Sequence, residues 1–197
     1  AFAGCSSLTE ITIPKSITNI SDGAFAGCSS LTEITIPKSI TSIGDNAFGG
    51  CSSLTEVKIP KGGTRIGDSA FHRCESLEQI EIPQSVSYIG VNAFGSTPWL
   101  SQMYEESEMI ILGDNVLYSV AWDMAGNCVI PDGVKSISDE AFLYSEITGV
   151  EIPDSVITIG DLAFSDCASL ASIEIPNSVT TMGSHVFYDC EKLTNVT

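Results

Sequence analysis

The cysteines are the residues whose type and spacing most suggest chemistry. Six of the seven keep a 23-residue interval, in one run of four and one run of two: Cys5, Cys28, Cys51 and Cys74, then Cys167 and Cys190. Zinc needs thiolates that converge into a tetrahedron, often as Cys-x-x-Cys, and the chain has no such pair. Neighbouring strands of a stack lie about 4.8 Å apart, whereas the Cβ atoms of a disulfide lie about 3.8 Å apart. We therefore predict a ladder of buried free thiols, with Cys128 also in the core.

Aspartates and histidines offer two further chemistries. Five aspartates recur just before the Ala-Phe position: Asp22, Asp45, Asp68, Asp139 and Asp161. Such a ladder could bind calcium, but the glycine-rich calcium repeat is absent, and capping of a single helical turn explains the aspartates without metal. His72 and His185 occupy unrelated positions of the repeat, and a catalytic triad needs one unique constellation. The sequence predicts no metal, no cofactor and no enzyme activity.

The elements that must position these residues repeat with the same period. A fixed interval of about 20–50 residues is typical of a solenoid, in which each repeat is buried by its neighbours. In repeat 24–46, Ile34 and Ile36 alternate with polar residues, which indicates a strand that Pro37 ends. A second short apolar stretch, 40–43, indicates another short strand, and the Gly-Asp pair that follows is expected to begin a helical turn.

The repeat resembles a known family. The pattern Cys-x-x-Leu-x-x-Ile-x-Ile-Pro-x-x-Ile/Val-x-x-Ile-Gly-x-x-Ala-Phe recurs along nearly the whole chain. It is similar to the BspA-like (Treponema pallidum type) leucine-rich repeats of bacterial surface proteins. The resemblance implies one leucine-rich-repeat solenoid over 1–197, an α/β repeat of short parallel strands plus helical turns with a 23-residue period. Because both ends fall mid-repeat, we expect further repeats or caps beyond them.

One segment breaks the period. Ala93-Phe94 is followed by the next Ala-Phe pair, Ala141-Phe142, only after 48 residues. Thr97 and a first-turn proline begin a predicted helix that ends at Glu106. Two apolar stretches, 109–112 and 116–120, flank Gly-Asp-Asn and predict a hairpin. We therefore predict a helix-plus-hairpin insert at about 97–127, with the repeat frame resuming at Cys128.

The insert holds the aromatic residues that interrupt the array. Such residues often mark contact sites, so the candidate insert contacts are Trp99, Tyr104 and Trp122. The plainer interpretation is that both tryptophans pack the helix and the hairpin against the stack.

A second candidate site is the outward side of the predicted strands. In leucine-rich repeats this face is the usual binding surface, although a strand face must be polar for solubility in any case. The candidate binding residues are Glu10, Glu33, Glu56, Lys58, Gln79, Glu81, Glu151 and Glu174.

Charge narrows the class of partner. The net charge is −17, and it is uneven, because residues 1–73 hold six bases and six acids while 74–197 hold two bases and nineteen acids. Nucleic acids and anionic membranes need basic patches, so neither is expected as a partner, and no apolar run is long enough for membrane insertion. A basic partner or plain solubility fits better. The residue after each proline changes from lysine early to aspartate late, which could promote end-to-end self-association or reflect drift among repeats.

Two functional hypotheses follow. The resemblance implies an extracellular, cell-surface location and a non-enzymatic binding or adhesion module for a protein or glycan, possibly a host matrix protein. The alternative is a structural spacer array within a larger surface protein. The two differ in whether the outward residues matter.

Overall fold

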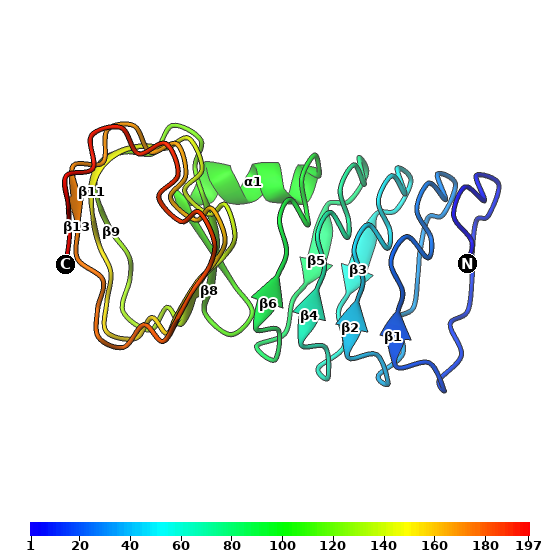
Figure 1. The fold of residues 1–197 in the computed structure, drawn as a ribbon. Coiled ribbons are helices and arrows are strands. Elements are labelled where there is room, and N and C mark those ends of the chain that lie inside the picture. The colour runs from blue at the N-terminus through cyan, green and yellow to red at the C-terminus, as the bar shows by residue number, and fades with distance from the viewer. The chain divides into compact units, whose positions relative to one another are not determined.

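The structure is a computed structural model that describes all 197 residues. The chain forms two compact units, Ala1–Glu106 (unit 1) and Ser107–Thr197 (unit 2). Each unit is a stack of rungs, where a rung is one circuit of the repeat (Figure 1). The leucine-rich-repeat solenoid and its period of about 23 residues are confirmed, whereas one continuous array over 1–197 stays a prediction.

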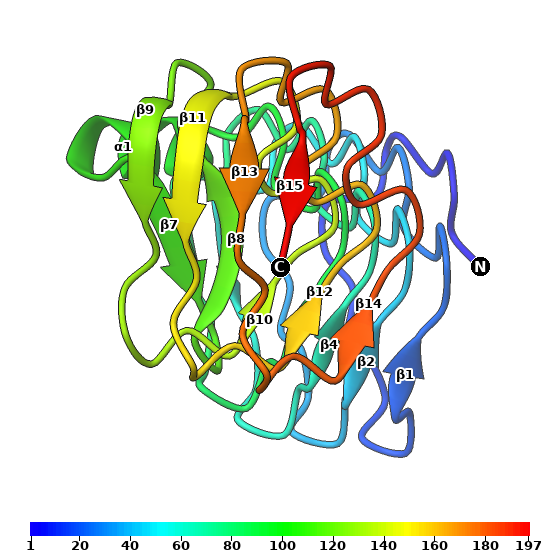
Figure 2. The ribbon, with the colours of Figure 1, turned by 60° about the vertical axis from the view of Figure 1, so that its left-hand side comes forward.

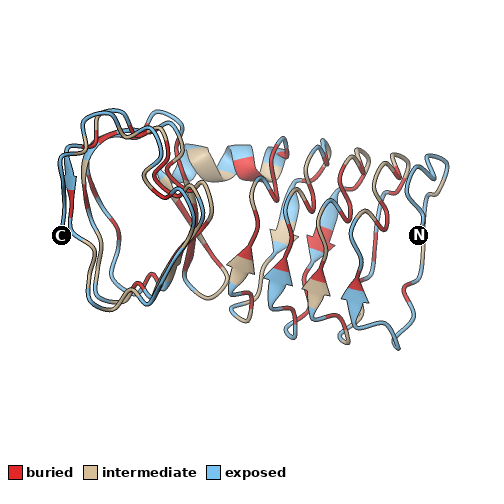
Figure 3. Ribbon diagram, in the orientation of Figure 1, coloured by how far each residue is buried: buried red, intermediate tan, exposed pale blue.

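The strands of unit 1 pair in parallel with the same position of the neighbouring rung. One sheet has the order β1 (Asn19–Ile20), β2 (Ser42–Ile43), β4 (Arg65–Ile66) and β6 (Tyr88–Ile89). A second sheet pairs β3 (Glu56–Lys58) with β5 (Gln79–Glu81). Since the register equals the repeat, each isoleucine of this sheet lies beside its counterpart in the next rung, and these isoleucines are buried. Figure 3 shows how buried and exposed segments alternate around each rung.

The segments expected to be helical turns are turns of another kind. A helix would keep its N–H bonds within itself. Here the N–H of Phe48 donates to Ala70 O of the next rung at 2.8 Å, and that of Cys51 donates back to Phe48 O at 3.1 Å. The alternation requires left-handed residues, at Asn46 (φ 52°) and Gly50 (φ 73°). The helical prediction is therefore wrong for the repeats, because the stack takes half of the N–H groups.

The recurrent Gly-Asp pair joins rungs, which corrects the capping expected for the aspartates. The carboxylate of Asp45 accepts the N–H of Asp68 in the next rung at 2.9 Å rather than capping its own repeat. The backbones approach so closely that a Cβ on Gly67 would lie 2.7 Å from the nitrogen of Asp45. Glycine is required here by that approach.

Stacked phenylalanines and thiols form the core of unit 1. The rings of successive rungs lie 5.2–5.8 Å apart and nearly parallel. Cys28, Cys51 and Cys74 are fully buried, and each thiol donates to a phenylalanine carbonyl of the preceding rung at 3.2 Å. All seven cysteines are free, as predicted, but Cys5 is exposed and Cys190 half-buried, because each lies in an outermost rung.

The helix and the hairpin form as predicted. They are α1 (Pro98–Glu106), in unit 1, and the antiparallel pair β7 (Met109–Leu112) and β8 (Val116–Val120), in unit 2. However, β8 also pairs in parallel with β10 (Ser136–Ile137), as other rungs pair. Residues of β8 therefore already lie in the stack, ahead of Cys128.

Unit 2 continues with short strands in three sheets, visible in Figure 2. The first follows the order β14, β12, β10, β8, β7, and two-stranded sheets join β9 to β11 and β13 to β15. The remaining bounds are β9 (Ala125–Val129), β11 (Glu146–Glu151), β12 (Thr158–Ile159), β13 (Ser172–Ile173), β14 (Thr181–Met182) and β15 (Asn195–Val196).

Candidate functional site

The outward side of the first strand position in unit 1 is a polar, exposed surface, called here the strand face. Parallel pairing of β3 with β5 places Glu56 beside Gln79 and Lys58 beside Glu81. The last pair forms an ion pair with both side chains more than two-thirds exposed. The exposed residues of the strand face are Glu10, Glu33, Glu56, Lys58, Gln79 and Glu81.

Helix α1 begins beside this surface for local reasons. The Thr97 hydroxyl accepts the N–H of Leu100 at 3.2 Å, which caps the helix, and Pro98 suits the first helical position. The N–H of Trp99 donates to Leu77 O at 2.9 Å, two residues before β5. The Trp99 ring meets Phe94 edge-on at 5.0 Å, so this indole extends the phenylalanine stack.

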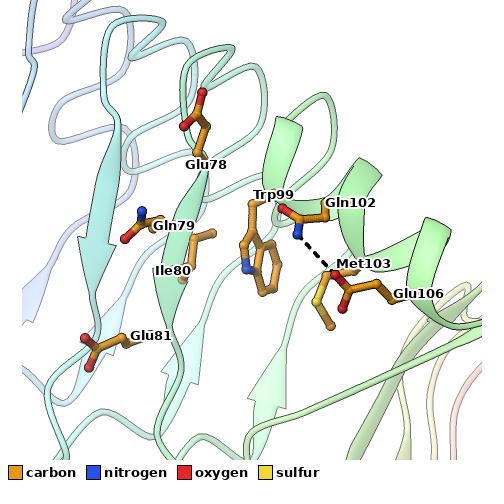
Figure 4. Close-up of a pocket in the computed structure, with 8 residues that line it drawn as sticks. All are labelled: Glu78, Gln79, Ile80, Glu81, Trp99, Gln102, Met103 and Glu106. Atoms are coloured by element: carbon orange, nitrogen blue, oxygen red, sulfur yellow. Dashed lines mark hydrogen bonds between the residues drawn. The ribbon is translucent and has the colours of Figure 1, made fainter.

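A hollow of about 500 Å³ lies between α1 and β5, called here the α1 hollow (Figure 4). Apolar side chains from both elements line it, together with polar ones at their ends. The residues that line it are Glu78, Gln79, Ile80 and Glu81 on the strand side and Trp99, Gln102, Met103 and Glu106 on the helix side. The hollow therefore brings members of both sequence-predicted sites, the strand face and the insert, into one place.

The charge around the α1 hollow is negative. Three of its lining side chains are carboxylates, Glu78, Glu81 and Glu106, and none is a lysine or arginine. The amide of Gln102 donates to Glu106 at 3.1 Å and so orients that carboxylate. Of the lining carboxylates, Glu81 forms an ion pair with Lys58, which is not itself part of the lining. The arrangement suits a positively charged group.

A second hollow, of about 340 Å³, lies further along the same strand face. Its polar lining is two glutamates and two threonines: Glu10, Glu33, Thr12 and Thr35. It has no aromatic wall, so its chemistry is that of an open acidic surface.

The other predicted contact residues lie apart from the α1 hollow. Tyr104 is half-buried on α1 but does not line the hollow. Trp122, in unit 2, is 87% exposed, so the packing interpretation is wrong for it and right for Trp99. Glu151, at the end of β11, and Glu174, which follows β13, are exposed residues of unit 2, and the Asn127 amide donates to Glu151 at 3.1 Å.

The buried thiols are chemically quiet. Burial raises the pKa of Cys51 and Cys74 to about 12 and that of Cys128 and Cys167 to about 11. A thiol that stays protonated is a poor nucleophile and metal ligand. No group of three or more His, Cys, Asp and Glu side chains is placed to hold a metal ion.

Sequence reasoning missed several residues of the hollow, although a signal existed. Trp99, Gln102, Met103 and Glu106 stand at i, i+3, i+4 and i+7 of the predicted helix, a spacing that puts them on one face. The sequence pattern does not show which surface this face of the helix lies against.

The fold and the surface define a class: a leucine-rich-repeat solenoid with an exposed polar strand face. Comparison with known proteins names the family. The model of the BspA type leucine rich repeat region matches residues 1–122 and 124–197 in six copies. The chain therefore belongs to the BspA-type leucine-rich-repeat family, as the repeat pattern implied.

Solved structures that match this chain come from several bacteria. A leucine-rich repeat protein of Bacteroides ovatus is 25% identical with a TM-score of 0.55, over 100% of this chain and 74% of that one. The leucine rich repeat protein of T. pallidum is 28% identical with a TM-score of 0.48, over 94% and 78%. A leucine rich cell surface protein of Faecalibacterium prausnitzii is 22% identical with a TM-score of 0.35, over 96% and 78%. No functionally curated protein matches the sequence.

No helix has the length and apolar character that a membrane-spanning segment needs.

Proposed function

We propose that this chain is a non-enzymatic binding module of a bacterial cell surface, which presents its strand face to a protein or glycan partner. The observation that carries the proposal is the strand face itself, a row of exposed polar side chains in register on a rigid stack. Each rung adds one set of side chains to the row, so the surface grows with the number of repeats. Affinity would come from many modest contacts rather than from one deep pocket.

The chemistry of the interior supports a binding role over a catalytic one. The nucleophiles of the core are thiols with pKa values raised by burial. The carboxylates of the strand face are exposed to water and do not converge on one enclosed pocket. Family membership supports the surface location, since the repeat resembles that of bacterial surface proteins.

The test is a binding screen of the chain against host matrix proteins and surface glycans. A variant with Glu33→Ala, Glu56→Ala and Glu81→Ala removes charge from the strand face only. A matched control removes three exposed acids of unit 2 that belong to neither candidate site, with Asp132→Ala, Glu146→Ala and Glu191→Ala.

Saturable binding that the strand-face variant loses and the control keeps would establish the proposal. Binding that both variants keep would exclude the strand face. Absence of binding to every candidate would favour the spacer alternative, in which outward residues do not matter.

A further inference from the structure

The α1 hollow differs from the rest of the strand face because it has an apolar wall. Elsewhere the strand face carries mainly glutamate, threonine and lysine, and its second hollow has Ile11 as its single apolar lining residue. Here α1 adds Trp99 and Met103 opposite Ile80, and Figure 4 shows the indole projecting into the space between helix and strand. A partner side chain that enters this space leaves water and contacts an aromatic ring.

The rim of the α1 hollow is acidic on both sides. Glu81 stands at the β5 side and Glu106 at the α1 side, while Glu78 stands one residue before β5. The edge contact with Phe94 holds the Trp99 ring, and the Gln102 amide holds Glu106. Side chains fixed before binding lose little entropy when a partner arrives.

We propose that the α1 hollow receives a basic side chain, an arginine, from a protein partner. This inference rests on the proposed function and names the partner's chemistry at one end of the strand face. A guanidinium stacks on an indole face through the ring quadrupole, and its fork of N–H donors matches a carboxylate. The hollow offers both partners at once, and its carboxylates are not balanced by any lining cation.

The negative charge of the α1 hollow determines which kind of partner side chain it favours. A neutral apolar side chain would use Trp99 and Met103 but would partly dehydrate the carboxylates of the rim without donating a hydrogen bond to them, which is unfavourable. An acidic group would meet like charge from three glutamates. Glu33 and Glu56, on neighbouring rungs of the strand face, extend the negative potential and favour a partner with a basic surface around its arginine.

Lys58 gives the inference a second, opposite prediction. Its ammonium already pairs with Glu81, so an incoming guanidinium must compete for that carboxylate. An exposed ion pair of this kind is weak, so its removal should change the affinity of the α1 hollow for an arginine only about two- to fivefold. Loss of Lys58 should therefore tighten binding of an arginine, whereas loss of Glu81 should weaken it.

The experiment uses Trp99 as its own reporter. The chain has two tryptophans, so Trp122→Phe leaves Trp99 as the only one, and Trp122 is too exposed for its loss to disturb the fold. The probe is an acetylated and amidated Gly-Arg-Gly-Arg-Gly-Arg-Gly peptide. Its neutral counterpart carries citrulline at each arginine and has nearly the same shape.

We expect a saturable change of Trp99 fluorescence with the arginine peptide and binding weaker by about tenfold or more with citrulline, because the ionic contacts are lost. Glu81→Gln with Glu106→Gln should weaken binding by about fivefold or more. Lys58→Gln should tighten it about two- to fivefold. The matched control, Glu146→Gln with Glu191→Gln, removes the same charge from exposed positions of unit 2 and should change affinity less than about twofold.

Three results would overturn the inference: no saturable fluorescence change, equal binding of the citrulline peptide, or equal loss in the two double variants. The last result would mean attraction to the overall charge alone. The outcome is separable from that of the proposed function. A partner found in the screen that needs Glu33 and Glu56 but is indifferent to Glu81→Gln with Glu106→Gln would keep the strand face and remove the hollow.

Discussion

The two units solve the same backbone problem with different residues. Each rung needs a left-handed residue just before the Ala-Phe position. Unit 1 places small or turn-forming residues there: Gly23, Asn46, Ser69 and Asn92. Unit 2 places Glu140, Leu162 and His185 at φ of 54–57°. Glycine and asparagine adopt this region readily, whereas a leucine does so at a cost.

The two units also differ in net charge and in exposed apolar side chains, and unit 2 has more of both. Residues 1–106 hold six bases and eleven acids, and residues 107–197 hold two bases and fourteen acids, for net charges of −5 and −12. Large exposed apolar side chains are also concentrated in unit 2, where Trp122 and Tyr144 are 87% and 70% exposed. The phenylalanine rings are tilted by 16–19° in unit 2 against 6–9° in unit 1.

The comparison teaches that register between rungs, not the identity of the turn residues, determines this fold. Unit 2 keeps the Gly-Asp link, with Asp139 accepting the N–H of Asp161 at 2.7 Å, and it keeps the stacked phenylalanines. We therefore expect the inter-rung links to matter equally in both units and the turn residues to matter differently.

The largest effect should come from the phenylalanine stack. Phe48→Ala and Phe164→Ala each leave a cavity in a fully buried position and should destabilise by about 3–5 kcal/mol. Hydrogen exchange should show lost protection chiefly in the unit that carries the substitution. Equal loss across both units for either variant would break the division into two.

The Gly-Asp link should be nearly as sensitive in both units. Gly67→Ala and Gly160→Ala force a Cβ against the backbone of the preceding rung and should each cost about 2–3 kcal/mol. Gly62 is the matched control, since a Cβ there would lie 3.6 Å from its nearest neighbour. Urea denaturation that ranks Gly62→Ala with Gly67→Ala would contradict the role of the link.

At alkaline pH the stability of the two units should depend on pH differently, because their buried thiols have different pKa values. Because burial raises the pKa of Cys51, Cys74, Cys128 and Cys167, each of these thiols keeps in the folded chain a proton that it loses in the unfolded chain above about pH 9. Stability is therefore intact at lower pH and falls as pH rises, by about 1.4 kcal/mol per thiol at pH 10. The fall should level off near the folded pKa, about 11 for Cys167 and about 12 for Cys51.

The measurement is urea denaturation from pH 8 to 11 by hydrogen-exchange or circular-dichroism readout. Cys51→Ala is the control, because it removes one titrating thiol and should flatten the slope of unit 1 alone. A slope unchanged by that substitution would assign the alkaline loss to other groups.

The smallest effect should come from the left-handed residues. Leu162→Asn relieves backbone strain in unit 2 and should stabilise by about 0.5–1 kcal/mol. The reverse change in unit 1, Asn46→Leu, should destabilise by a similar amount. Thermal denaturation that moves both variants in the same direction would show that side-chain packing at these positions outweighs the backbone.

Much of the fold is predictable because each rung repeats the same sequence pattern. The alternation at Ile34 and Ile36 and the prolines that follow such runs predict short parallel strands. The cysteines at 23-residue intervals predict a buried thiol ladder and a register of one repeat. Helix α1 is predictable from Thr97-Pro98, and the hairpin from Gly-Asp-Asn. These are local or periodic signals, which a single sequence carries in full.

The failures share one physical cause, which is that neighbouring rungs supply hydrogen-bond partners. The turn near Asp45 reads as a capped helix because the sequence does not show that Asp68 will lie one rung away. Likewise β8 reads as part of an insert because it pairs with β10 at an interval of 20 residues, Val116 beside Ser136, instead of the 23 residues of the repeat.

The sequence by itself determined the family, the period, the identity of the core residues and the polar character of the strand face. Only the tertiary structure decided that Trp99 lies beside Gln79 and Glu81 while Trp122 remains exposed. The reason is that periodicity specifies contacts between equivalent positions of a stack, whereas α1 meets β5 at a contact that occurs once. A unique contact leaves no repeating trace in the sequence, and the candidate site is built on such a contact.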